Sequence, residues 1–175
     1  MVREALFSIL GNAVPDRPFF DVFAGTGVVG LEAISRGASR CTFVERDFRV
    51  AGEIEHYLHE FRVADRATIA RADVYRWAER WEPPAEPVNV FFSPPFADFG
   101  RRPAEFLTLV RRVQEKVADG SVVVVQSERG AIEDEGTIFA GWDVRHYGRN
   151  ELLIWVKEEP GQEGSEGAAD DDTGP

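Results

Sequence analysis

A glycine-rich turn between an apolar strand and a helix is the feature that most constrains this chain. The run Phe19–Phe23 is short, aromatic and bounded by Pro18 and Gly25, which is typical of a buried strand. Residues 28–36 favour a helix, and Gly37 suits the position that ends it. Glycines let the backbone turn tightly and let a ligand approach closely, while the start of a helix offers unpaired N–H groups. The order strand, glycine turn, helix therefore predicts a site for a nucleotide-containing cofactor.

Apolar runs alternate with helical stripes along the rest of the chain. Asp47 is placed to cap a helix whose inner face we assign to Ile54, Tyr57, Leu58 and Phe61. We expect helices at residues 2–10, 28–36, 48–61, 74–81 and 103–117, and strands at residues 19–23, 40–45, 67–70, 88–92, 122–126, 137–145 and 151–156. The fold class is therefore α/β: a Rossmann-like sandwich with a mostly parallel seven-stranded sheet and a C-terminal antiparallel hairpin.

Charge is distributed unevenly along the 175 residues. The net charge is −11, but residues 158–175 hold seven acids and no base, which leaves 20 bases against 24 acids in the rest. Because these last residues are also rich in glycine and poor in apolar side chains, we expect a folded domain at residues 1–157 and a disordered acidic tail at residues 158–175. A nearly neutral domain weighs against a nucleic-acid substrate, although a local basic patch is enough to bind one.

The composition also predicts where the protein resides. No apolar stretch approaches the roughly 18 residues of a membrane helix, so we expect no membrane partner. The N-terminus lacks the apolar core of a signal peptide. The single cysteine, Cys41, cannot form an internal disulfide and lies in an apolar run. We therefore expect a monomeric, cytoplasmic protein.

The polar residues of interest follow the predicted parallel strands, at the edge of the sheet where ligands bind in such folds. The candidate cofactor-binding residues are Asp21, Phe23, Gly25, Gly27, Glu45, Arg46, Asp73 and Val74, and the candidate catalytic residues are Ser93, Pro94, Pro95 and Phe96. Asp73 has an alternative role as the cap of the helix that follows it. We expect no metal, because His56 and His59 are placed on a solvated helix face without a third ligand.

Two cofactors compete for the glycine turn. Gly25-x-Gly27-x-x-Gly30 with Glu45 downstream satisfies the dinucleotide fingerprint, so a nicotinamide-dependent oxidoreductase is one hypothesis. S-adenosylmethionine presents the same ribose to the same acid. The run of residues 93–96, Ser-Pro-Pro-Phe, favours methyl transfer, because two prolines fix the backbone and remove two N–H donors, which leaves carbonyl acceptors beside an exposed aromatic ring. Such an array suits a planar substrate that bears an amine.

Several motifs resemble those of one bacterial family. They are Arg-Glu-Ala-Leu-Phe at residues 3–7, the turn at residues 21–30, Gly-Leu-Glu-Ala at residues 30–33, Ser-Arg-Gly-Ala at residues 35–38, Val-Glu at residues 44–45, Pro-Pro-Phe at residues 94–96 and Tyr-Gly at residues 147–148. Together they are similar to the RsmD-like family, whose members have a class I methyltransferase fold and use S-adenosylmethionine to methylate a guanine N2 amine of small-subunit (16S) ribosomal RNA. The similarity covers residues 2–156.

The resemblance implies roles for individual residues and a partner. Gly25 and Gly27 would pass under the cofactor, Glu45 would hold its ribose and Asp73 its adenine amine, and Asp21 would lie near its methionine end. Pro94 and Phe96 would position a flipped guanine of 16S rRNA, in the small ribosomal subunit or its assembly intermediate.

The chain departs from the family pattern in two places. Ser93 stands where the family has Asp or Asn, so a catalytically weak or silent relative that binds cofactor or RNA is the alternative to an active enzyme. The basic segment that usually precedes residues 3–7 is largely absent. Methylation of another RNA, a protein or a small molecule is a further alternative.

Overall fold

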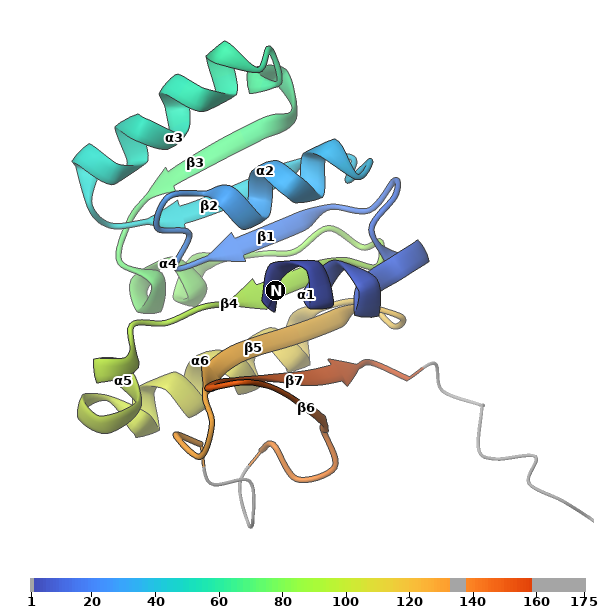
Figure 1. Cartoon of the computed structure of the whole chain (residues 1–175), viewed down its shortest axis with the longest axis vertical. Coiled ribbons are helices and arrows are strands. Elements are labelled where there is room, and N and C mark those ends of the chain that lie inside the picture. The colour runs from blue at the N-terminus through green and yellow to red at the C-terminus, as the bar shows by residue number, and fades with distance from the viewer. Residues whose placement is uncertain (1, 133–137, 159–175) are drawn as a thin grey trace, which may run out of the picture.

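Seven strands form a single sheet in the computed structural model, which describes residues 2–132 and 138–158. The strands follow the order β3-β2-β1-β4-β5-β7-β6 (Figure 1). Strands β1 to β5 are parallel, and β7 runs antiparallel to both β5 and β6. Their bounds are β1 Phe19–Val22, β2 Cys41–Glu45, β3 Ala67–Arg71, β4 Asn89–Phe92, β5 Val122–Glu128, β6 Asp143–Tyr147 and β7 Asn150–Val156. The expected mostly parallel sheet with a C-terminal antiparallel hairpin is confirmed.

Helices cover both faces of the sheet. In Figure 1, α1, α2 and α3 lie on one face, whereas α4 and α6 lie on the other. The helices are α1 Val2–Leu10, α2 Val28–Ser35, α3 Phe48–Glu60, α4 Val74–Arg80, α5 Phe96–Arg101 and α6 Pro103–Lys116, with short 3-10 turns at Gly11–Ala13 and Ala64–Arg66. Among the described helices, none combines the length and the apolar character needed to cross a membrane.

The central strands are buried on both faces, so alternate residues supply two separate cores. Phe20 and Val22 of β1 pack with α4 and α6, whereas Phe19 packs with α1, α2 and α3. Asp21 faces the same side as Phe19, because successive side chains of a strand point to opposite faces. Asp21 therefore places a carboxyl group in a core of apolar side chains.

Local capping fixes where several helices begin. The carboxylate of Asp47 accepts hydrogen bonds from the backbone N–H groups of Arg49 and Val50 at 2.8 and 3.2 Å, which confirms its predicted role as the cap of α3. The predicted inner face of this helix is wrong for two residues, however. Tyr57 and Phe61 are 42% and 57% exposed and stack on each other with ring centroids 6.0 Å apart. Phe61 lies beyond the last residue of α3, and Ile54 and Leu58 occupy the buried stripe.

Two other differences concern the second half of the chain. The six-residue helix α5 follows the two prolines without a helical pattern long enough to predict it. The predicted strand at residues 137–145 is wrong in its bounds, because residues 138–141 form a turn and β6 begins only at Asp143. Thr137 and residues 159–175, which include nearly all of the predicted acidic tail, lie outside the described residues.

Candidate functional site

A cavity of about 220 Å³ opens where the carboxyl ends of β1, β2, β3 and β4 meet. Strand order reverses here, because the chain passes from β1 outward to β2 and β3 and then returns to β4 on the other side of β1. Eight of the twelve predicted site residues line the cavity: Phe23, Gly25, Glu45, Arg46, Asp73, Val74, Ser93 and Pro95. Three other lining residues, Val44, Tyr75 and Asp98, were not among the predicted site residues.

The glycine turn owes its shape to three different constraints. Gly25 has a φ of +53°, and a Cβ built on it would meet no atom within 4 Å, so this glycine leaves open space beside the cavity. Gly27 has a φ of +71°, and a Cβ there would lie 2.9 Å from Ile54 of α3. Gly30 would place a Cβ 2.2 Å from the ring of Phe43. Only Gly25 has the open surroundings expected of a residue against which a ligand lies; the other two let α2 pack closely.

Phe23 adopts a backbone conformation that is rare for its residue type. Its φ is +65°, in the left-handed region that a bulky side chain seldom occupies. Its ring packs edge-on against Tyr75, with centroids 5.9 Å apart and an interplanar angle of 72°. Strained residues of this kind concentrate at functional sites. The unusual backbone conformation directs the Phe23 ring into the cavity from the end of β1, where it forms an apolar wall.

Asp21 does not line the cavity. Its side chain is 1% exposed, and its Oδ2 accepts a hydrogen bond of 2.9 Å from the backbone N–H of Gly30. Burial raises the pKa of this carboxyl from 3.8 to about 7, with the Gly30 hydrogen bond opposing the shift and the charge of Glu45 adding to it. The structure therefore shows Asp21 tying β1 to the first turn of α2, behind the glycine turn.

Glu45 and Asp73 both combine a local structural contact with exposure to the cavity. Glu45 Oε2 accepts from Gly25 N at 2.9 Å, and its Oε1 accepts from Asp47 N at 2.8 Å. Asp73 Oδ1 caps α4 by accepting from the N–H groups of Tyr75 and Arg76 at 3.1 and 3.2 Å, so the capping role is confirmed. An ionised carboxylate offers about four acceptor positions, so each acid keeps capacity for a ligand.

A polar cluster joins α4 to the segment after β4. The hydroxyl of Tyr75 donates to Asp98 Oδ2 at 2.9 Å, and the guanidinium of Arg102 lies 3.9 Å from the centroid of the Tyr75 ring. Arg102 also pairs with Glu105 and approaches Asp73 Oδ2 to 3.8 Å. Partial burial and the Asp98 hydrogen bond raise the pKa of Tyr75, which stays protonated as a donor. The cluster fixes α5 beside the cavity.

The Ser-Pro-Pro-Phe run leaves β4 at the same edge. Ser93 donates its backbone N–H to the carbonyl of Val22 at 3.2 Å, and its hydroxyl makes no hydrogen bond with any described residue. Pro94 is buried, whereas Phe96, the first residue of α5, is 52% exposed. Neither Pro94 nor Phe96 lines the cavity. The run therefore passes from the cavity at Ser93 to an exposed ring at Phe96 within four residues.

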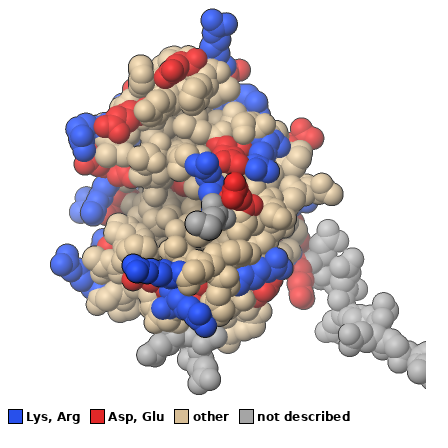
Figure 2. Space-filling view, in the orientation of Figure 1, with Lys and Arg blue, Asp and Glu red and all other residues tan. Residues whose placement is uncertain are grey.

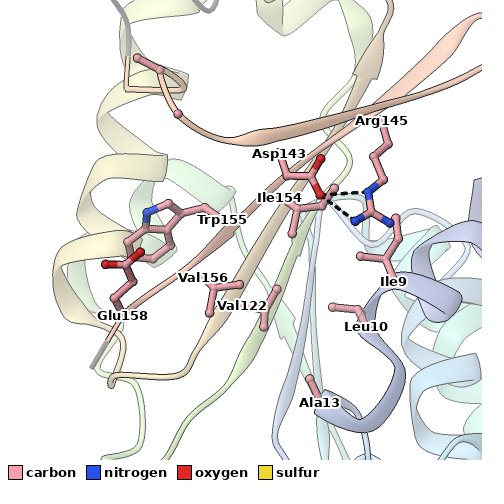
Figure 3. Close-up of a pocket in the computed structure, with 12 residues that line it drawn as sticks. Ile9, Leu10, Ala13, Val122, Asp143, Arg145, Ile154, Trp155, Val156 and Glu158 are labelled. Atoms are coloured by element: carbon pink, nitrogen blue, oxygen red, sulfur yellow. Dashed lines mark hydrogen bonds and ion pairs between the residues drawn. The ribbon is translucent and has the colours of Figure 1, made fainter. Parts of the chain in front are cut away.

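A wider groove of about 810 Å³ lies elsewhere, between α1 and the β6–β7 hairpin. Figure 3 shows Leu10, Val122 and Ile154 along it, with the ion pair of Asp143 and Arg145 at its rim. Val122 begins β5, so this groove is at the opposite edge of the sheet from the cavity. It contains none of the predicted site residues, and its apolar lining suits packing rather than chemistry.

Comparison with known proteins points to one group of relatives. A family model described as "Conserved hypothetical protein 95" matches residues 1–156. The Ribosomal RNA small subunit methyltransferase D of Escherichia coli is 33% identical over 96 residues, which are 54% of this chain and 46% of that protein. YlbH of Bacillus subtilis, named provisionally as an rRNA methyltransferase, is 30% identical over 125 residues, which are 70% of this chain and 66% of YlbH. The chain thus spans between about half and two thirds of these two relatives.

Solved structures show the same architecture. The protein yhhF of Escherichia coli, titled provisionally as a methyltransferase, superposes with a TM-score of 0.73 at 27% identity, covering 90% of this chain and 85% of yhhF. An RNA methyltransferase of Salinibacter ruber, solved with S-adenosyl-L-homocysteine, superposes with a TM-score of 0.60 at 17% identity over 93% of this chain and 94% of that one. The second similarity concerns the fold alone, which is the class I methyltransferase fold.

Proposed function

Because the chain belongs to the RsmD-like family, we propose that it is an S-adenosylmethionine-dependent rRNA methyltransferase. Its substrate would be a guanine N2 amine of 16S rRNA, in the small ribosomal subunit or its assembly intermediate. One observation carries the proposal: a single cavity brings two acids, Glu45 and Asp73, together with Ser93 at the start of the Ser-Pro-Pro-Phe run. The two carboxylates can accept hydrogen bonds from the hydroxyl and amine groups of a nucleoside, and the Ser-Pro-Pro-Phe run can accept hydrogen bonds from a substrate amine.

The residues around the cavity fit the nucleoside part of S-adenosylmethionine. Glu45 would offer carboxylate oxygens to ribose hydroxyls, and Asp73 would accept a hydrogen bond from the adenine amine. Val44, Val74 and Phe23 supply apolar walls for a flat ring. The open space beside Gly25 lets a ligand lie against the backbone. Gly27 would support the turn from behind, Arg46 would flank the ribose, and Asp21 would hold the turn at Gly30.

The cofactor, when bound, supplies a methyl group on a positively charged sulfonium. The residues of the chain then have to orient the acceptor amine, which is a poor nucleophile because its lone pair is shared with the guanine ring. The Ser93 hydroxyl and the Pro94 carbonyl would accept hydrogen bonds from the two N–H groups of the amine, which aims the nitrogen and stabilises positive charge as it develops. Pro95 would keep this backbone rigid, and the exposed ring of Phe96 would stack on the extracted base.

Ser93 gives the proposal its sharpest test. A hydroxyl is shorter than the family's Asp or Asn side chain and carries no charge, so we expect Ser93→Asp to raise methyl transfer to unmodified small subunits while leaving cofactor affinity unchanged. Transfer of radiolabelled methyl groups to isolated subunits measures the first effect, and calorimetry measures the second. Ser35→Asp, the same change at an exposed position at the end of α2, serves as the matched control. An unchanged rate in Ser93→Asp would contradict the role of Ser93 as an amine acceptor.

Titration of the wild-type chain separates the proposal from its rivals. S-adenosylmethionine and its demethylated product should bind saturably, whereas NAD should not. Binding of NAD alone would establish the nicotinamide alternative and refute methyl transfer. Cofactor binding without any detectable transfer to RNA would instead favour the silent relative that Ser93 suggests.

A further inference from the structure

Exposed apolar side chains gather around the cavity at the carboxyl edge of the sheet. Among the residues that the structure describes, six large apolar or aromatic side chains are between 42% and 72% exposed: Val28, Phe48, Tyr57, Phe61, Phe96 and Val156. Three of them, Val28, Phe48 and Phe96, are the first residues of α2, α3 and α5. Each follows a residue that lines the cavity by one to three positions. Single exposed apolar residues are common on protein surfaces, but a group around one cavity indicates a binding surface.

Backbone contacts hold Phe48 beside the cavity. The carboxylate of Glu45 accepts from Gly25 N at 2.9 Å and from Asp47 N at 2.8 Å, so it ties the start of α3 to the glycine turn. Phe48 is the next residue after Asp47. Its side chain is 72% exposed and belongs to neither of the two cores. A flat aromatic surface is therefore left to solvent at the edge of the cavity.

Phe96 occupies the corresponding position on the other side of the cavity. It follows β4, whereas Phe48 follows β2, and β1 lies between these two strands in the sheet. Because neighbouring strands are about 4.8 Å apart, the ends of β2 and β4 are about 10 Å apart. Arg46 and Pro95, which shortly precede the two aromatic residues, line the same cavity. A base that enters the cavity beside Phe96 therefore leaves Phe48 free to contact a neighbouring base.

Charge at this edge of the sheet is mixed. Figure 2 shows both basic and acidic side chains along the left margin, where Figure 1 shows the parallel strands ending. Next to Phe48, the exposed Arg46 is flanked by an acid on each side, and Arg49 pairs with Glu53 at 3.7 Å. Attraction of phosphate groups is therefore weak beside Phe48. Stacking on an aromatic ring is the contact that a nucleobase makes without a surplus of positive charge.

We propose that Phe48 stacks on an RNA base that neighbours the base to be methylated. This inference rests on the proposed function and specifies how the substrate lies: across the cavity, with the methylated base toward Phe96 and a neighbouring base on Phe48. Stacking of this kind tolerates any sequence, because every base has a π-face. Phe48 would thus be a positioning residue that holds the RNA beside the site, while the groups around Ser93 orient the amine.

The affinity of the full chain for isolated, unmodified small ribosomal subunits, measured over a range of salt concentrations, tests this role. Phe48→Ala should bind about 5- to 150-fold more weakly, which is the effect of losing one stacked base. The slope of log affinity against log salt should stay unchanged, because Phe48 carries no charge. Phe48→Tyr keeps an aromatic ring and should retain the affinity. Phe48→Leu is apolar without a ring and should lose it.

Phe61→Ala is the matched control. Phe61 is also an exposed phenylalanine, but it lies just beyond the last residue of the 13-residue helix α3, about 20 Å from Phe48. This variant should bind subunits like wild type. Calorimetry with S-adenosylhomocysteine reports on the cofactor cavity independently and should be unchanged in every variant.

Each other outcome overturns the inference in a distinct way. Wild-type affinity of Phe48→Ala for subunits would refute stacking while the proposed function stands, and so would equal losses in Phe48→Ala and Phe61→Ala. Wild-type affinity of Phe48→Leu would show an apolar contact in place of stacking. A loss of S-adenosylhomocysteine affinity in Phe48→Ala would assign the ring to the cofactor. If the wild-type chain binds cofactor but no subunits, the RNA substrate itself is refuted, and the role of Phe48 with it.

Discussion

Replacing Asp21 by Asn should change how the stability of this protein depends on pH. The Asp21 carboxyl is 1% exposed, and burial raises its pKa from 3.8 to about 7. The folded protein therefore binds a proton that the unfolded chain releases between about pH 4 and pH 7. The free energy of unfolding contributed by this group is complete below pH 4 and is lost as the pH rises through 7. At 1.36 kcal/mol per pKa unit, a shift of this size corresponds to about 4 kcal/mol.

Asn retains a carbonyl oxygen that can accept from Gly30 N but does not ionise. Urea unfolding of the cofactor-free proteins measures the free energy of unfolding of the variant minus that of wild type. This difference should rise by about 4 kcal/mol between pH 4 and pH 8. Asp47→Asn is the control with the opposite sign, because the exposed Asp47 carboxylate has its pKa lowered by the N–H groups of Val50 and Arg49. Wild type gains on that variant only as the pH rises toward 3.8, so between pH 4 and pH 8 the difference for Asp47→Asn should stay flat. A flat difference for Asp21→Asn would refute the argument from burial.

Three further outcomes follow from contacts around the site. Gly30→Ala should cost about 1 to 3 kcal/mol of unfolding free energy in urea, because the new Cβ would lie 2.2 Å from the Phe43 ring; a neutral effect would mean that α2 shifts freely. Asp73→Ala should lose about 1 kcal/mol as a helix cap and also weaken S-adenosylmethionine binding in calorimetry, whereas Asp73→Asn should keep the cap and lose only affinity. Tyr75→Phe removes the hydroxyl that donates to Asp98 at 2.9 Å. It should raise the KM for the RNA and leave the thermal stability nearly unchanged. An unchanged KM would show that packing alone positions α5.

Much of the fold could be predicted because the relevant signals are local. The cap at Asp47 and the stop at Gly37 depend on a few neighbouring residues, and α2 and α3 begin and end within a residue or two of the predicted bounds. The errors occurred where tertiary packing overrides local pattern. Tyr57 and Phe61 have the apolar character of core residues, yet Tyr57 is exposed on α3 and Phe61 is exposed just beyond its end, because Ile54 and Leu58 fill the space against the sheet.

The candidate site was also partly predictable. Glu45, Asp73 and Ser93 follow consecutive strands of a parallel sheet, so the fold class alone places them at one edge. Tyr75 and Asp98 were missed because they are 23 residues apart and carry no motif; their hydrogen bond exists only because α4 and α5 meet beside the cavity.

The sequence by itself determined the alternation of strands and helices, the glycine turn and the family to which the chain belongs, because each depends on residue types at short spacing. The tertiary structure decided what each turn residue does. Gly25 borders open space while Gly30 meets Phe43, and Asp21 is buried behind the turn rather than exposed to the cavity. Spacing along the chain cannot distinguish these roles, because the atoms that set them apart come from β2 and α3, elements that reach the turn only when the sheet has formed.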